Sequence, residues 1–337
     1  MAVNFKNDYN TIADKRILEA LVKYSGEKNI GYGEDIHSKE LNDMVNNILG
    51  KDVDTYVLAG GTITNVIGLN QMLRAPYEAV MAVKSAHINV HETGALESTG
   101  HKVIYLDNIG GKVDIRKIEA TYKMYADNHM VLPKALYISN ATELGETYTL
   151  SELKEIYNIT RRLKLYLFID GARLPEALVS GGYTLKDIAG YCDMFYLGGT
   201  KLGLPFGEML VIINDELKRN FKYMLKNRLG LFAKGFVGAI MFKEFLKDDY
   251  YLELARREKE MADMLREGLD RYVCYRNETN QVFLKVKTNK LKALNELVLF
   301  EVWEDLGEDS VIRLVTSYAT TKDEVLECLE AFKYLGM

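Results

Sequence analysis

The spacing of hydrophobic positions predicts that strands and helices alternate up to about residue 245. Apolar runs of strand length occur in "DTYVL", "KALYISN", "LYLFID" and "GEMLVIIN". Between such runs apolar residues recur at helical spacing, as in "TLSELKEIYNITRRLK", where Thr149 or Ser151 opens the helix. This alternation predicts an α/β fold with a doubly wound, mainly parallel sheet. The predicted strands lie in 54–58, 79–93, 102–108, 134–140, 165–170, 193–198 and 207–214.

Beyond about residue 245 the pattern changes, which predicts a second unit. The stretch "YYLELARREKEMADMLREGLDRY" has the pattern of a long, charged amphipathic helix, and shorter strand-like and helical stretches follow it. We therefore expect a small α+β domain that packs with the N-terminal helix. The predicted divisions are an N-terminal arm with helices, a large domain and a small C-terminal domain, over residues 1–45, 46–245 and 246–337.

Composition narrows the class of protein. The 337 residues are 48% hydrophobic, which is enough for a full core, and the formal charge of −5 is mixed in sign along the chain. We therefore expect no nucleic-acid partner. No apolar run reaches membrane-spanning length, and the first residues lack the apolar segment of a signal peptide. The three separated cysteines form no CxxC pair, and no metal-ligand spacing occurs. We expect a cytoplasmic protein with reduced thiols, no membrane contact and no metal.

The stretch "AGGT" follows the first predicted strand and precedes a helix. Backbone amides of Gly60 and Gly61 at a helix N-terminus would form a seat for an anion, and Thr62 would add a hydroxyl. An ordinary strand-to-helix turn is the alternative interpretation. Neither GxxxxGK[ST] nor GxGxxG occurs, so a Walker loop or a dinucleotide fingerprint is not supported.

Asp170 and Arg173 lie in "LYLFIDGAR", directly after a very apolar strand. A carboxylate at that place is costly unless a donor or cation pairs with it, although Asp-Gly turns are also common. Arg173 could form an ion pair at the strand end or bind a ligand carboxylate through two parallel hydrogen bonds. Because ligands gather at the carboxyl ends of strands in open α/β sheets, both residues are candidates for a site.

Lys201 follows another apolar strand, in "MFYLGGTKLG". A dry, apolar setting lowers the pKa of a lysine amine and makes it a nucleophile, whereas a buried stem with an exposed tip is the alternative. A phosphate seat, a strand-end aspartate and a strand-end lysine are together the parts of a pyridoxal phosphate (PLP) site. The lysine would form a Schiff base, the aspartate would keep the pyridine nitrogen protonated, and the loop would bind the phosphate.

A pyridine ring also needs a surface to stack on. His87 and His91 in "SAHINVHETG" are spaced to share one side of a predicted strand. Either one alone is more simply explained as a surface or hydrogen-bonded core histidine. With a cofactor present, His87 is the better candidate for stacking.

Four segments of the chain resemble the threonine aldolase family of PLP enzymes, in the β-eliminating lyase group of fold type I. They are "NDYNTIA" with "GYGED", "AHINVHETGALESTGHKV", "FIDGARLPEAL" and "DMFYLGGTKLGLPFGE". The resemblance runs from about residue 5 to about residue 320. The interval between Asp170 and Lys201, 201 − 170 = 31 positions, also agrees with the family.

The resemblance implies a role for each matching residue. Lys201, His87 and Asp170 would be catalytic. Asn7, Arg173 and Arg313 would bind the substrate α-carboxylate. Family members form dimers or tetramers with sites at the dimer interface, so Arg228 or Lys234 of a partner subunit would reach the phosphate. The implied cofactor-binding residues are Gly60, Gly61, Thr62, His87, Asp170, Arg173, Thr200 and Lys201.

The departures from the family fall on the substrate side of the site. The chain has "GTKLG" for serine-lysine-glycine, "LGLFAKG" for a glycine-rich segment, "SNATELG" for asparagine-threonine-histidine, and "VTS" for "VTH". The expected activity is PLP-dependent cleavage of β-hydroxy-α-amino acids of the L-threonine or L-allo-threonine type to glycine and an aldehyde. His91, Glu92 or a water would be the base. The alternatives are another fold type I enzyme (β-eliminating lyase or aminotransferase) acting on a small or aromatic amino acid, and a catalytically idle α/β protein that binds a phosphorylated ligand or a partner.

Overall fold

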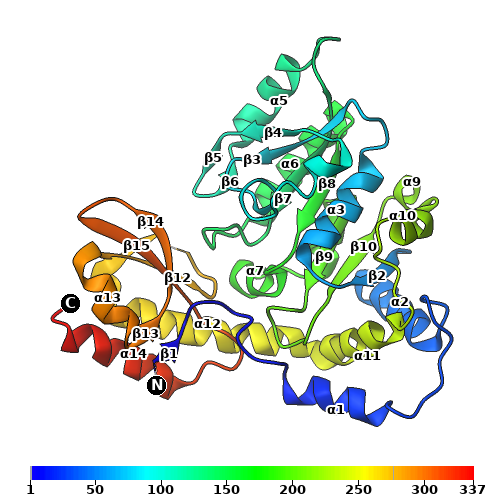
Figure 1. Cartoon of the computed structure of the whole chain (residues 1–337). Helices are drawn as coiled ribbons and strands as arrows, with labels where there is room; N and C mark the ends of the chain where they lie inside the picture. The colour runs from blue at the N-terminus through cyan, green and yellow to red at the C-terminus, as the bar shows by residue number, and fades with distance from the viewer. Residues whose placement is uncertain (1, 276) are drawn as a thin grey trace.

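A seven-stranded sheet forms the centre of the larger of two units, in the order β2-β10-β9-β8-β7-β3-β4 (Figure 1). The computed structural model describes residues 2–275 and 277–337. Neighbouring strands are parallel except β10, which is antiparallel to both β2 and β9. The predicted mainly parallel sheet is therefore confirmed. The strands are β2 (Asp54–Leu58), β3 (Glu78–Val83), β4 (Val103–Leu106), β7 (Leu132–Ser139), β8 (Tyr166–Asp170), β9 (Met194–Gly198) and β10 (Glu208–Ile212).

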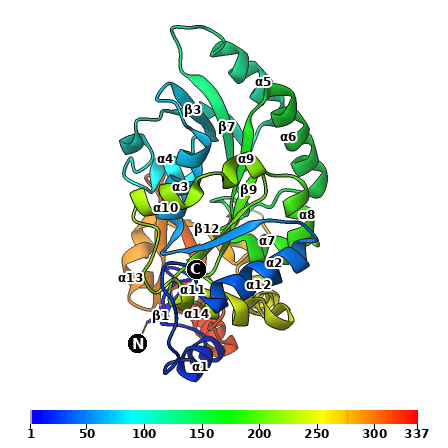
Figure 2. The ribbon, with the colours of Figure 1, turned by 90° about the vertical axis from the view of Figure 1, so that its right-hand side faces the viewer.

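Helices cover both faces of this sheet, and α3 and α6 lie on opposite sides of it (Figure 2). β9 and β10 are buried at every position, as expected of strands between two helical layers. α6 begins after Thr149, which forms a capping box with Glu152, so Thr149 rather than Ser151 opens it. The helices of this unit are α2 (Ile36–Leu49), α3 (Gly61–Met72), α5 (Ile115–Met124), α6 (Leu150–Leu163), α7 (Leu174–Gly181), α8 (Leu185–Gly190), α9 (Asp215–Lys218), α10 (Phe221–Asn227) and α11 (Gly235–Leu246).

The smaller unit is a four-stranded sheet, in the order β11-β12-β15-β14, with helices packed against it. α12 (Tyr250–Gly268) runs through both hydrophobic cores: Leu254 belongs to the large core and Leu265 to the small one. This is the predicted small α+β unit, while the exact domain boundaries stay a prediction. Its elements are β11 (Val273–Tyr275), β12 (Gln281–Lys287), α13 (Leu291–Asn295), β14 (Glu301–Asp305), β15 (Asp309–Val315) and α14 (Lys322–Tyr334).

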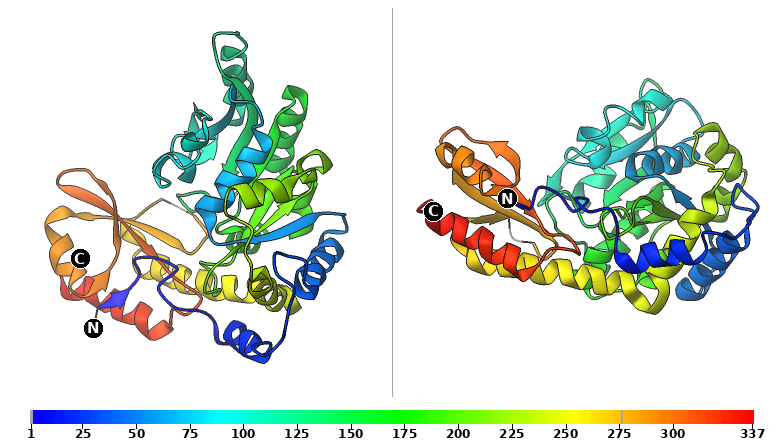
Figure 3. Two further views of the ribbon diagram at one scale, coloured as in Figure 1. Left: turned by 45° about the vertical axis from the view of Figure 1, so that its right-hand side comes forward. Right: turned by 60° about the horizontal axis from the view of Figure 1, so that its bottom comes forward.

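The N-terminal arm crosses from the small unit to the large one (Figure 3). β1 (Val3–Asn4) pairs in parallel with β13 (Val298–Leu299) in the small unit. α1 (Lys15–Lys23) instead packs on α11, and Ile17 belongs to the large core. The expectation that the N-terminal helix packs with the small unit is therefore wrong. A two-residue strand, too short to give a periodic signal, makes that contact.

The segment 79–93 also differs from its prediction. β3 ends at Val83, and α4 (His87–Val90) is a short helix rather than a strand. The alternation of polar and apolar residues in α4 resembles a strand, yet Ile88 is the only one of its four residues that is buried. The Asn89 side chain donates to the Val83 carbonyl at 2.7 Å and fixes the turn out of the sheet. One turn of helix still places His87 and His91 together, because positions four apart share a helix face.

Candidate active site

The carboxyl ends of β7, β8 and β9 and the N-terminus of α3 surround a cavity of about 290 Å³. Lys201, Asp170, Arg173, His87, Thr200 and the Gly60–Thr62 turn all line this cavity. Asn7 and Arg313 do not line it. The structure thus brings together most residues that the sequence singled out. The cavity is also lined by Tyr9, Ser139, Ala141, Thr142, Glu143, Ala172, Tyr196 and Glu208.

Two glycines allow the Asp170 and Lys201 segments to approach each other. A Cβ atom on Gly171 would lie 1.8 Å from the carbonyl oxygen of Tyr196, and one on Gly198 would lie 2.4 Å from that of Ala172. No larger residue fits at either position without moving the backbone. The tight packing fixes the two strand ends side by side.

Lys201 lies in the turn after β9, where burial makes protonation of its amine unfavourable. Burial lowers the pKa of its amine below the ordinary value, and the nearby Arg173 cation lowers it further. The carboxylates of Asp8, Asp170 and Glu208 act in the opposite direction but do not cancel the shift. Within residues 2–275 and 277–337, no carboxylate forms an ion pair with this amine. Lys201 therefore has the properties of a nucleophilic lysine.

Asp170 is surrounded by donors. Its Oδ1 accepts hydrogen bonds from the Tyr196 hydroxyl and, at 3.0 Å, from the Ala172 amide. Its Oδ2 accepts from the Tyr137 hydroxyl and, at 3.0 Å, from Asn65 Nδ2. Burial and the Asp170 charge raise the pKa of both tyrosines well above the ordinary value, so both phenols keep their protons. The carboxylate is buried and fixed in orientation.

His87 is held by two glutamates. Its Nδ1 lies 2.7 Å from Glu92 Oε1, and its backbone amide donates to Glu143 Oε1 at 2.9 Å. Asn65 Nδ2 donates to the same Glu92 oxygen at 2.8 Å and so links this pair to Asp170. Neither Glu92 nor His91 lines the cavity, and the contact of Glu92 with His87 Nδ1 favours an orienting role for Glu92 over a role as base. Burial, together with the charges of His87 and Arg313, lowers the pKa of His91.

The Gly60–Thr62 turn offers free amides to the cavity. α3 starts at Gly61, and its N-cap Gly60 makes no side-chain capping bond. The first N–H groups of a helix have no partner inside the helix, so an anion can accept hydrogen bonds from them. Thr200 lies across the cavity, where its hydroxyl accepts from the Gly207 amide at 3.0 Å.

Arg173 forms an ion pair, which is one of the two roles expected for it, but its partner is Asp8 on the N-terminal arm. Its Nε lies 2.7 Å from Asp8 Oδ2 and its Nη2 lies 3.2 Å from Oδ1, while Asn280 Nδ2 donates to the same carboxylate at 3.0 Å. Burial opposes the ionisation of Asp8, but the charges of Arg173 and Lys201 outweigh it and hold the pKa of Asp8 below its ordinary value. Asn7 accepts from the Tyr9 amide at 3.1 Å, and its contact with a substrate stays a prediction.

Arg313 on β15 has spare hydrogen-bonding capacity. Its Nη1 donates to Gln281 Oε1 at 3.2 Å, and its buried Nε has no partner among the described residues. Its guanidinium carbon lies 4.9 Å from the centre of the Trp303 ring. Burial and the Arg173 cation lower the pKa of Arg313 to about 10. An additional carboxylate near Arg313 would relieve both effects.

Four buried residues belong to the site although no local sequence pattern indicated them: Asp8, Asn65, Tyr137 and Tyr196. Each contacts a residue distant in sequence, so only packing reveals its role. Arg228 donates to Asn70 at 3.2 Å, and neither Arg228 nor Lys234 lines the cavity of its own chain. Their contact with a partner subunit's phosphate site stays a prediction.

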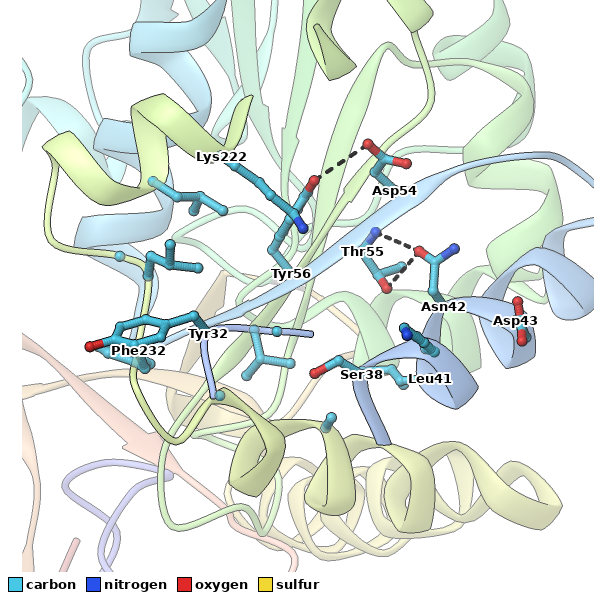
Figure 4. Close-up of a pocket in the computed structure, with 18 residues that line it drawn as sticks. Tyr32, Ser38, Leu41, Asn42, Asp43, Asp54, Thr55, Tyr56, Lys222 and Phe232 are labelled. Atoms are coloured by element: carbon cyan, nitrogen blue, oxygen red, sulfur yellow. Dashed lines mark hydrogen bonds between the residues drawn. The ribbon is translucent and has the colours of Figure 1, made fainter. Parts of the chain in front are cut away.

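A second cavity, of about 270 Å³, lies beside the edge strand β2 (Figure 4). Its polar groups bond to one another. Asn42 Oδ1 accepts from the Thr55 amide at 2.9 Å and the Thr55 hydroxyl at 3.0 Å, and the Tyr56 hydroxyl lies 3.4 Å from Asp54. Lys222 pairs with Glu34. This cavity lacks the convergence of a lysine, a buried aspartate and free helix amides.

The chain is similar to proteins of known structure and activity. The chain is 38% identical to a threonine aldolase of Leishmania major, with a TM-score of 0.96 and 99% of each chain covered. It is 29% identical to a low specificity L-threonine aldolase of Pseudomonas over 274 residues, which is 78% of each chain. Cystalysin of Treponema denticola, whose structure contains pyridoxal 5'-phosphate, shares the fold at 16% identity, with a TM-score of 0.72 and coverage of 99% of this chain and 91% of cystalysin.

The sheet order, the small C-terminal unit and the strand-end lysine and aspartate define the class as fold type I, the architecture of a large group of PLP enzymes. Within that class the chain belongs to the beta-eliminating lyase family, whose model matches residues 11–289. No helix of the described residues is long and apolar enough to cross a membrane.

Proposed function

We propose that the protein is a PLP-dependent lyase that cleaves β-hydroxy-α-amino acids of the L-threonine or L-allo-threonine type to glycine and an aldehyde. One observation carries the proposal: a lysine amine with a lowered pKa shares a cavity with a buried aspartate and the free amides of a helix N-terminus. The likeness to threonine aldolases supports the choice among reactions. We further propose a cytoplasmic homodimer or homotetramer with sites at the dimer interface.

The residues present fit the cofactor. The cavity of about 290 Å³ is close to the lower end of the range for small-molecule sites, roughly 300 Å³. Lys201 would bind the aldehyde carbon, Asp170 the pyridine nitrogen, and the Gly60–Thr62 turn with Thr200 the phosphate. His87, held by Glu92, would stack on the ring. When bound, the cofactor would supply an electron sink for a bond that breaks at Cα.

The protein's own groups would direct which bond breaks. Arg313, whose buried Nε has no partner within the part of the chain that the structure describes, would bind the substrate carboxylate together with Arg173, whose position Asp8 fixes. A fixed carboxylate sets the orientation of the other bonds at Cα. A base would then take the β-hydroxyl proton while Cα–Cβ breaks. A lowered pKa keeps His91 neutral at pH about 7, as a proton acceptor must be. A water on the same side is the other candidate.

β-Elimination is the second candidate, because the matched family is described by that reaction. The serine hydroxyl would leave as water together with the Cα proton, and hydrolysis of the remaining unsaturated amino acid would give pyruvate and ammonia. The groups around Lys201 would serve either reaction, since both begin at Cα.

A product assay tests the proposal. PLP-loaded protein would be incubated separately with L-threonine, L-allo-threonine and L-serine. We expect glycine and acetaldehyde from the first two. Pyruvate and ammonia as the main products would instead support β-elimination, and turnover only with an added keto acid would support transamination. Protein that neither binds PLP nor releases any product would contradict the whole proposal. A sedimentation measurement would test the oligomer.

A further inference from the structure

Glu208 is a carboxyl group placed where an anion is expected to bind. It is the first residue of β10, where its register partners are Leu58 on β2 and Gly198 on β9. The Gly60–Thr62 turn begins two residues after Leu58, and Lys201 lies three residues after Gly198. Glu208 therefore lies between the two parts of the site, and its side chain lines the cavity.

This carboxyl group is poorly compensated when ionised. Glu208 is only 4% exposed, and its Oε2 accepts one hydrogen bond from the Gly199 amide at 3.0 Å. Among the described residues it forms no ion pair. Burial raises the pKa of Glu208 to about 7 and the Asp170 charge adds to this shift, while the Gly199 amide, the Lys201 charge and the Thr200 hydroxyl oppose it. The Glu208 charge also raises the pKa of the Tyr196 phenol, which stays protonated.

A dianionic phosphate at the Gly60–Thr62 turn would add two negative charges to this setting. An ionised Glu208 would repel it, whereas a protonated carboxyl has an O–H that can donate a hydrogen bond to a phosphate oxygen. We propose that Glu208 binds the phosphate group of the cofactor as a neutral acid and thereby makes cofactor affinity depend on pH. This inference rests on the proposed PLP site and extends it.

The test compares two aldehydes that differ only in the phosphate. Dissociation constants of PLP and of pyridoxal, which lacks the phosphate, are measured by absorbance titration from about pH 7 to about pH 9. The protonation of Lys201 affects both aldehydes equally, so the ratio of the two affinities isolates the phosphate contact. The phosphate itself is already about nine-tenths dianionic at the lower end of this range, because its second pKa is roughly 6, so its own titration changes the ratio little.

In the wild-type protein we expect the preference for PLP over pyridoxal to fall roughly tenfold or more over this range, as the carboxyl with a pKa of about 7 loses its proton. Glu208→Gln keeps the shape and a donor but cannot ionise, so its preference should stay constant with pH. Glu143→Gln is the matched control: Glu143 is another cavity glutamate whose burial raises its pKa, but it contacts Ser139 and His87 instead. Its preference should fall as in the wild type.

Two results would overturn the inference. Equal loss of PLP and pyridoxal affinity in the wild type would mean that Glu208 acts on the Lys201 amine. The same fall in preference in Glu208→Gln would mean that another group titrates. In both cases the yellow absorbance of lysine-bound PLP would still support the proposed function, whereas no lysine-bound cofactor at any pH would overturn both.

Discussion

Two of the cavities of this protein have nearly the same volume, about 290 and about 270 Å³, but they differ in how their polar groups are used. In the cavity beside β2, Asn42 accepts a hydrogen bond from Thr55, and Lys222 forms an ion pair with Glu34. In the candidate active site, Lys201 has no ion-pair partner among the described residues and Arg313 has a buried nitrogen without an acceptor. Unused binding capacity and shifted proton affinity, rather than volume, distinguish a reactive cavity from a structural one.

Replacing Lys201 tests this contrast with the largest expected effect. Lys201→Ala should abolish the yellow absorbance of bound PLP and product formation together, because no other described amine lines the cavity. Lys222→Ala, in the cavity beside β2, is the matched control and should change neither. Normal cleavage by Lys201→Ala would show that the site is wrongly assigned.

Asp170→Asn should have the next largest effect. The amide keeps the shape but loses the charge that would hold the pyridine nitrogen protonated, so we expect kcat to fall by roughly 10²–10³ while some cofactor still binds. Asp54→Asn removes a carboxylate from the other cavity and should leave kcat unchanged. Unchanged turnover in Asp170→Asn would exclude the proposed electronic role of this aspartate.

Arg313→Lys should weaken substrate binding with little loss of stability. Lysine keeps a charge but loses the planar pair of donors, which corresponds to a rise in KM of about 10- to 100-fold for a bond worth roughly 1.5–3 kcal/mol. Arg173→Lys should lower stability as well, since it disturbs the bidentate pair with buried Asp8. Steady-state kinetics and urea unfolding of both variants separate the two effects. Equal losses of stability would contradict the distinction.

The smallest expected effect lies in the second cavity. Asn42→Ala removes the acceptor of the Thr55 amide, so the free energy of unfolding should fall by about 1–3 kcal/mol. KM and cofactor affinity should stay unchanged. A change in either would mean that the cavity beside β2 also has a ligand or communicates with the site.

The sequence was most informative about candidate site residues that directly follow a strand. Lys201, Asp170 and the Gly60–Thr62 turn could be predicted as neighbours, because the carboxyl ends of parallel strands meet at one edge of a sheet. The partners of these residues could not. Asp8 contacts Arg173 from the N-terminal arm, 165 positions earlier in the chain. Tyr137 lies on β7 and contacts Asp170 on the neighbouring strand β8. Local pattern also mistook α4 for a strand, since four residues are too few to distinguish the two periods.

Trp303 gives the site a property of its own. It is the single tryptophan of the chain, and it lies on β14 with its ring against Arg313 and its centre 6.3 Å from that of His91 on the large unit. All indole fluorescence of this protein therefore originates where the two units face each other. A substrate carboxylate bound to Arg313, as proposed, would change the electric field at this ring. Emission would then report ligand arrival directly, without an attached dye and before any product forms.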